Sequence, residues 1–232
     1  VEIGTGKWVK FVKDSDGKVT TVEETLDRNG AKITGNVFGG GKGKADTFLC
    51  EKAMIGKDGD GVNNPDGGTH VTIGNGTVDY NVYGGGEIGR VEKNTVVTIG
   101  LADAGSDKSK PVIKGSVFGG GKGEEEHGYA ALVRGNPTVT IQGNAKVRHS
   151  VYGGGEGSGT TVTGDVEVNI GGPEGDAFVG GEITIGGSVY GGSALGAVNA
   201  TRGTGSELSP TTGATTKVTL KKGNVTRYVF GG

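Results

Sequence analysis

The sequence predicts an all-β protein, a right-handed parallel β-helix (β-solenoid) that carries inserted loops on one side. A short motif, Val followed by Phe or Tyr and then by two or three glycines, recurs six times. Its aromatic residues lie 34 to 45 positions apart, a spacing typical of solenoids and other repeat arrays. Glycine supplies 52 of the 232 residues and recurs at fixed offsets, which favours an ordered repeat over a disordered chain.

Short runs of alternating apolar and polar residues lie upstream of the glycine motifs. Val71-Thr72-Ile73 and Val139-Thr140-Ile141 are examples. Similar runs end at Ile99, Ile170, Ile185 and Leu220. Alternation with period two and β-branched residues predicts half-buried strands, with Val and Ile pointing inward and Thr pointing to solvent. No stretch shows a helical period over a helical length, so we expect almost no helix.

The motif holds half of the Phe and Tyr residues of the chain. In a solenoid, every coil repeats the same corner, so an aromatic residue there would stack on its equivalents above and below. The glycines that follow would permit a positive φ and a close approach of neighbouring coils. The sequence therefore predicts an aromatic column formed by Phe38, Tyr83, Phe118, Tyr152, Tyr190 and Phe230.

The repeat units alternate between two lengths. Ile33 precedes its aromatic residue by five positions, whereas Ile73 precedes its own by ten, and the two forms alternate along the whole chain. We expect a two-part super-repeat of two or three coils. The residue after the glycines also alternates in charge, which predicts a charge column that helps to set the register of the coils more than it stabilises them. Its members are Lys42, Glu87, Lys122 and Glu156. Four unrelated solvated charges explain the same residues.

The first 30 residues predict a β-hairpin. Two alternating runs flank an Asp-Gly pair at positions 16 and 17, a strong signal for a hairpin turn. We expect residues 1–30 to form a capping hairpin that shields the first coil, and residues 31–232 to form the solenoid domain. The last motif ends the chain in mid-repeat, so we expect a segment of a longer protein.

Composition and charge disfavour several classes of protein. The formal net charge of −2 provides no basic field for nucleic acid. No run of 18 apolar residues is present, so we expect no membrane span in this segment. The single cysteine, Cys50, excludes an internal disulfide framework.

Inserted segments separate the strand units and are the expected binding surface, because solenoid insertions gather on one side and carry function. The segments are 42–69, 101–110, 122–137, 171–182 and 193–216. The larger ones follow the glycines of the short units, so we expect them to emerge along one edge of the rod.

One inserted loop suggests calcium. Asp58, Asp60 and Asn64, with Asp66 close by, place oxygen-bearing side chains at intervals along a loop that contains glycine. A hard cation such as Ca²⁺ takes six to eight oxygen ligands. The loop resembles the Asp-rich calcium loops of thrombospondin type 3-like repeats, although Gly56 replaces their leading Asp. An ordinary turn rich in Asp, Asn and Gly explains the same residues.

Two alternatives concern the strands. Parallel β-helices include polysaccharide lyases and hydrolases, but glycoside hydrolysis needs two carboxylates that flank one bond. No inward pair is evident, and Glu167 is a single outward carboxylate in a strand. The strands could also align their threonines into an ice- or crystal-binding column. That column would comprise Thr72, Thr98, Thr140, Thr184 and Thr219, interrupted by Glu167.

From about Ile33 onward, the glycine motif and its upstream strands resemble the glycine-rich tandem repeats of large surface or secreted proteins of anaerobic gut bacteria. The resemblance implies an extracellular, adhesin-like parallel β-helix and assigns no functional residues. We expect a structural or adhesive segment whose loops bind a glycan or a host or bacterial surface protein, next to further repeats of the same polypeptide. The alternative is a polysaccharide-degrading enzyme.

Overall fold

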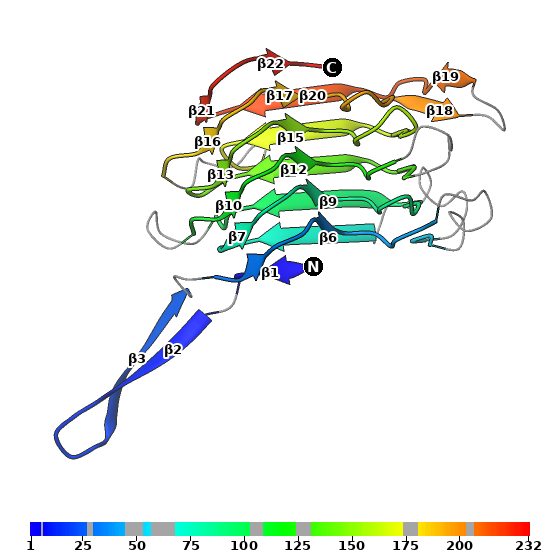
Figure 1. Ribbon diagram of the computed structural model, residues 1–232. Coiled ribbons are helices and arrows are strands. Elements are labelled where there is room, and N and C mark those ends of the chain that lie inside the picture. Colours follow the sequence, from blue (N-terminus) through cyan, green and yellow to red (C-terminus); the bar gives the residue numbers. More distant parts are fainter. Residues whose placement is uncertain are drawn as a thin grey trace.

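The computed structural model describes residues 1–5, 7–26, 30–44, 53–56, 68–102, 109–123, 131–173, 181–202 and 207–232. These residues form a rod of stacked coils, with the N-terminus at one end and the C-terminus at the other (Figure 1). The rod contains three six-stranded parallel sheets, each of which takes one strand from every coil. The predicted parallel β-helix is therefore confirmed. The described residues contain no helix that could cross a membrane.

Each coil contributes one strand to sheet 1, one to sheet 2 and one to sheet 3, in that order along the chain. Sheet 1 comprises β1 (Glu2–Ile3), β6 (Gly68–Ile73), β9 (Asn94–Ile99), β12 (Pro137–Ile141), β15 (Val166–Ile170) and β20 (Thr216–Leu220). Sheet 2 comprises β4 (Lys32–Ile33), β7 (Thr77–Val78), β10 (Val112–Ile113), β13 (Lys146–Val147), β16 (Thr184–Ile185) and β21 (Asn224–Val225). Sheet 3 comprises β5 (Val37–Phe38), β8 (Val82–Tyr83), β11 (Val117–Phe118), β14 (Val151–Tyr152), β17 (Val189–Tyr190) and β22 (Val229–Phe230). Coils 1 to 6 follow this order.

The interior of the rod is a set of aliphatic columns. In sheet 1, Ile73, Ile99 and Ile141 lie side by side in register and are fully buried. The valines of the glycine motif form the equivalent column in sheet 3. Burying one such side chain contributes about 1.5–3 kcal/mol, so a few inward residues per coil stabilise the rod without long strands.

Glycines with a positive φ lie at the corner between sheets 1 and 2. Gly76, Gly100 and Gly143 have φ angles of 97°, 95° and 65°. Gly171 and Gly223 occupy the same corner in the next two coils, with φ angles of 105° and 133°. This is the conformation that L side chains rarely adopt, and it turns the chain from sheet 1 into sheet 2.

The glycines of the repeated motif serve a different purpose. None of them has a positive φ, so that part of the expectation was wrong. A Cβ on Gly84 would lie 2.3 Å from the carbonyl oxygen of Gly119, and a Cβ on Gly119 would lie 2.2 Å from that of Gly153. These glycines are required by the close approach of successive coils at the corner between sheets 3 and 1.

The alternation of unit lengths reflects where extra residues are inserted into the coils. Coils 1, 3 and 5 carry extra residues between sheets 1 and 2, at 4–31, 100–111 and 171–183, whereas coils 2, 4 and 6 cross that corner in three or four residues. The strand ending at Ile33 or Ile185 therefore belongs to sheet 2, and the strand ending at Ile73 belongs to sheet 1. Every aromatic residue of the motif marks one coil, so the super-repeat contains two coils.

Insertions occur at two corners of the rod. Segments 39–67, 119–136 and 191–215 join sheet 3 to sheet 1, whereas segments 4–31, 100–111 and 171–183 join sheet 1 to sheet 2. Segment 191–215 contains the antiparallel pair of β18 (Ala200–Arg202) and β19 (Leu208–Pro210). The three insertions that follow the glycines of the short units share one corner as expected. Segment 4–31 is of similar length and lies at the other corner, so the insertions as a whole are not confined to one side.

The N-terminal hairpin is confirmed, but its place in the fold differs from the expectation. Strand β2 (Lys7–Lys13) pairs antiparallel with β3 (Val19–Leu26). Asp14 closes the turn, because its Oδ1 accepts hydrogen bonds from the amides of Asp16 and Lys18. The hairpin is an insertion within coil 1, since β1 precedes it in sheet 1. It forms a separate two-stranded sheet and extends away from the rod (Figure 1), so the structure gives no support to a capping role for residues 1–30.

Candidate functional site

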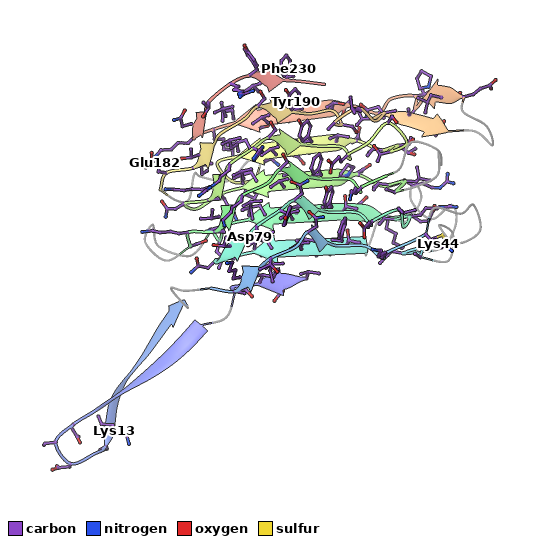
Figure 2. The ribbon with its side chains drawn as sticks, in the orientation of Figure 1. Lys13, Lys44, Asp79, Glu182, Tyr190 and Phe230 are labelled. Atoms are coloured by element: carbon purple, nitrogen blue, oxygen red, sulfur yellow. The ribbon has the colours of Figure 1, made fainter. Side chains whose placement is uncertain are left out.

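The six aromatic residues of the motif form one continuous column along sheet 3. Successive ring centroids are 4.7 to 5.0 Å apart, and successive ring planes differ by only 3° to 7°. Figure 2 shows its last two members, Tyr190 and Phe230, one above the other. Each inner ring has both faces covered by its neighbours, so only ring edges can reach a ligand. The column stabilises the rod and offers no stacking platform along its length.

Tyr83 anchors a polar cluster at the outer edge of the column. Its ring is fully buried, its hydroxyl donates to the carboxylate of Glu156, and Asn81 Nδ2 donates to the same hydroxyl at 2.8 Å. Burial raises the pKa of Tyr83 well above its ordinary value, and the hydrogen bond to Glu156 adds to this effect, whereas the bond from Asn81 opposes it. Tyr83 is therefore a protonated donor that joins coil 2 to coil 4.

The backbone places the four residues of the predicted charge column next to one another, because β-bridges connect Lys42, Glu87, Lys122 and Glu156 in successive coils. Glu87 lies between two lysines, 3.0 Å from Lys42 Nζ and 3.6 Å from Lys122 Nζ. Glu156 instead turns toward Tyr83. Three of the four residues thus form ion pairs with one another, and each exposed pair contributes up to about 1 kcal/mol.

A ladder of side-chain oxygens at the corner between sheets 2 and 3 was not predicted. At the position before the motif valine, each side chain accepts a hydrogen bond from the backbone amide of the equivalent residue in the next coil, at 2.7 to 3.3 Å. The accepting residues are Asn36, Asn81, Ser116, Ser150 and Ser188. The recurrence of Asn or Ser before Val could have indicated it.

A second ladder of this kind opens sheet 1. Asn94 Oδ1 accepts from the amide of Asn136, Asn136 Oδ1 accepts from that of Asp165, and Asp165 Oδ1 accepts from that of Thr215. These bonds satisfy amides that lie immediately before the strands of sheet 1 begin. They help to keep this corner in register from coil to coil.

The corner between sheets 3 and 1 contains a small core of its own. Val91, Val133 and Val162 lie in bridged register and are buried together with Val166. Beside them, the fully buried carboxylate of Glu92 lies 2.5 Å from Arg90 Nη2 and 2.6 Å from Arg134 Nε. The sequence analysis did not predict this Arg–Glu–Arg group, because its residues lie outside the alternating apolar and polar runs that indicate strands.

The outer face of sheet 1 does not carry the threonine column that the sequence suggested. Thr72, Thr98, Thr140 and Thr219 lie in one column, but Asn169 interrupts it between Thr140 and Thr219, and Thr184 belongs to sheet 2. Thr140 and Asn169 are buried. Glu167 lies in the adjacent column and accepts a hydrogen bond from Asn169 Nδ2 at 3.0 Å. A regular exposed array of hydroxyls is therefore absent from this face as described.

The proposed calcium ligands Asp58, Asp60, Asn64 and Asp66 lie outside the described residues. Within the described ranges, no group of three or more His, Cys, Asp or Glu side chains is arranged to hold a metal ion.

A row of long, exposed side chains follows the corner between sheets 2 and 3. It consists of Tyr80, His149 and Arg227, which come from coils 2, 4 and 6. Arg148 and Lys146 of coil 4 are exposed beside it. Sequence reasoning missed this row, because its members share no residue type.

These features define a parallel β-solenoid whose stacked residues hold the coils in register and whose even-numbered coils expose a row of side chains at one corner. No protein-family model, curated protein or solved structure gives a match to this chain.

Proposed function

We propose that this chain is a structural or adhesive repeat segment of a large bacterial cell-surface or secreted protein. The inserted segments at the corner between sheets 3 and 1 would bind a glycan or a surface protein of a host or bacterium. The supporting observation is the division between a uniform rod and its insertions. The core, the aromatic column and the side-chain ladder between sheets 2 and 3 run through all six coils, while the insertions differ in length and residues. Repeat proteins commonly present binding surfaces in this way.

The carboxylates of the rod support a scaffold rather than an enzyme. Glu87 and Glu92 each contact two cations, and Asp165 accepts bonds from Thr215. Glu156 accepts from Tyr83, and Glu167 accepts from Asn169. A glycosidase needs two carboxylates directed at one substrate bond, whereas these carboxylates connect residues of the rod to one another.

The bacterial and extracellular assignment is supported by the motif itself, which resembles the glycine-rich repeats of surface and secreted proteins of gut anaerobes. The stacked rod fits the adhesin-like architecture that this resemblance implies. The possible calcium loop at 58–66 would then stabilise one of the binding insertions.

The test is binding of the whole chain to a glycan array and to mucin and matrix proteins, with and without Ca²⁺. In one variant, residues 43–67 are replaced by the chain's own short corner, residues 88–93. In the matched control, residues 101–110 at the other corner are removed. We expect the first variant to lose binding and the control to keep it. Equal binding by both variants, binding to no probe, or release of reducing ends or unsaturated uronides would contradict the proposal.

A further inference from the structure

One position at the corner between sheets 2 and 3 alternates strictly between glycine and a long side chain. Backbone hydrogen bonds of 2.9 to 3.3 Å connect the residues of coils 2 to 6 in order. From coil 1 to coil 6 the residues are Gly35, Tyr80, Gly115, His149, Gly187 and Arg227.

The glycines of coils 3 and 5 are required by their surroundings. A Cβ on Gly115 would lie 2.2 Å from Asn81 Oδ1, and a Cβ on Gly187 would lie 2.4 Å from Ser150 Oγ. The side-chain ladder at this corner therefore excludes side chains from these coils. Among coils 2 to 6, only the even-numbered coils can project one, and successive projecting residues are roughly 10 Å apart, twice the spacing of neighbouring strands.

Tyr80 differs from the six rings of the aromatic column. It is 60% exposed, and the equivalent positions in both neighbouring coils are glycines, so no equivalent ring stacks on it. A tyrosine with an accessible ring face and a polar tip is suited to contact a sugar ring, which has apolar C–H faces and polar edges.

The lysine and arginine side chains in and beside the row carry positive charge. Arg148, Lys146 and Arg227 are exposed, and within the described part of the chain none of them forms an ion pair. Asp79 is neutralised, because it lies 2.6 Å from Lys114 Nζ and 3.9 Å from Lys32 Nζ. The exposed Glu182 lies at the far end of sheet 2, at the corner with sheet 1 (Figure 2). A second carboxylate, Glu156, lies near the row, because its Oε2 accepts from Asn81 Nδ2 at 3.4 Å. Among the described residues of this corner, lysines and arginines outnumber carboxylates, in a chain of net charge −2.

We infer that this corner binds an acidic polysaccharide, bearing uronic acid or sulfate groups, that runs along the rod. Tyr80 stacks on one sugar ring, and Arg148, His149 and Arg227 donate to carboxylate or sulfate groups farther along. Charge-assisted bonds from arginine to such groups are among the stronger polar contacts. A nucleic acid is less suited, because its binding rests on a wide basic field that this chain lacks. The surface is separate from the insertions of the proposed function.

The experiment measures binding of the whole chain to heparin and polygalacturonate, with neutral dextran and duplex DNA as comparison probes. Because the altered side chains are exposed, the variants Arg148→Gln/Arg227→Gln and Tyr80→Ala should keep the thermal stability of the parent. We expect Kd for an acidic polysaccharide to rise about tenfold or more in the arginine double variant. Tyr80→Ala should weaken binding several-fold, and Tyr80→Phe should retain it.

The matched control is Lys13→Gln/Lys18→Gln, which removes the same charge from exposed positions of the hairpin turn and should bind like the parent. Replacement of residues 43–67 should also leave this binding unchanged, which separates it from the proposed function. The inference is overturned if neither acidic polysaccharide binds at low salt, or if both charge variants weaken binding equally. Equal or tighter binding to DNA would also overturn it, because the row would then be a general polyanion surface.

Discussion

The Tyr83 hydroxyl donates a hydrogen bond to the carboxylate of Glu156, which belongs to a coil two places farther along the rod. Phe118, the ring of the intervening coil, has no hydroxyl that could compete for this carboxylate. The link therefore depends on the order of Tyr and Phe in the column. It connects the aromatic column to the charged residues beyond the glycines.

Removing the Tyr83 hydroxyl should destabilise the rod, because Tyr83→Phe keeps the stacked ring but removes the hydroxyl that bridges Asn81 and Glu156. We expect a loss of about 1–2 kcal/mol in the free energy of unfolding, measured by urea denaturation. Tyr152→Phe, which alters a half-buried ring of the same column, is the matched control and should change little. Equal losses in both variants would show that the Glu156 contact contributes nothing specific.

The raised pKa of Tyr83 also predicts a pH dependence. The tyrosine ionises near pH 10 in the unfolded chain and at higher pH in the folded rod. Its contribution is therefore complete below about pH 10 and is lost as the pH rises toward the folded value. Between pH 9 and 11, stability should fall less steeply in Tyr83→Phe than in the parent. Parallel curves would contradict the assignment.

The first glycine of the motif in coils 1 to 5 should tolerate no side chain, because its added Cβ would lie 2.1 to 2.4 Å from a carbonyl oxygen of the next coil. Gly119→Ala places a Cβ against the carbonyl of Gly153 and should cost at least about 1–3 kcal/mol. Gly35→Ala is the control, since nothing lies within 4 Å of its added Cβ and its φ is not positive. Its stability should be unchanged or up to about 1 kcal/mol higher. Denaturation of the two variants side by side tests the distinction, and similar effects would refute it.

The buried Glu92 should matter far more than the exposed Glu87, although each carboxylate contacts two cations. Glu92→Gln leaves Arg90 and Arg134 without the buried negative charge and should cost about 3–5 kcal/mol. Glu87→Gln removes two surface pairs and should cost no more than about 1 kcal/mol. Thermal unfolding should be measured at low and high salt. Added salt should reduce the stability difference between the parent and Glu87→Gln more than the difference between the parent and Glu92→Gln. Comparable losses would mean that the Arg–Glu–Arg group is not a structural element.

Leu195 predicts a stabilising substitution. It is 83% exposed and has a φ of 72°, while Gly157 occupies the equivalent place in the preceding coil with a φ of 103°. Leu195→Gly removes a strained backbone conformation and little buried surface, so it should raise stability by about 1 kcal/mol. A lower melting temperature than that of the parent would show that the exposed leucine has packing of its own.

Several features of the site followed from residue spacing. The aromatic column could be predicted because a Phe or Tyr recurs at the same place in the glycine motif, and each motif marks the same corner of a coil. The charge column followed from the same register, although the turn of Glu156 toward Tyr83 did not. Glu92, Tyr80 and the Asn and Ser ladders were missed, because their roles depend on neighbours in other coils rather than on the sequence around them.

The sequence by itself determined the inward face of each strand and the spacing of the repeated motif, since both are local properties. The number of coils in each super-repeat was decided by the tertiary structure. Only the tertiary structure decided which strands pair. The runs ending at Ile73 and Ile185 look alike, yet they belong to different sheets. The physical reason is that backbone hydrogen bonds and close packing between coils select a partner for a whole strand, and that choice depends on the corners and insertions on either side of it.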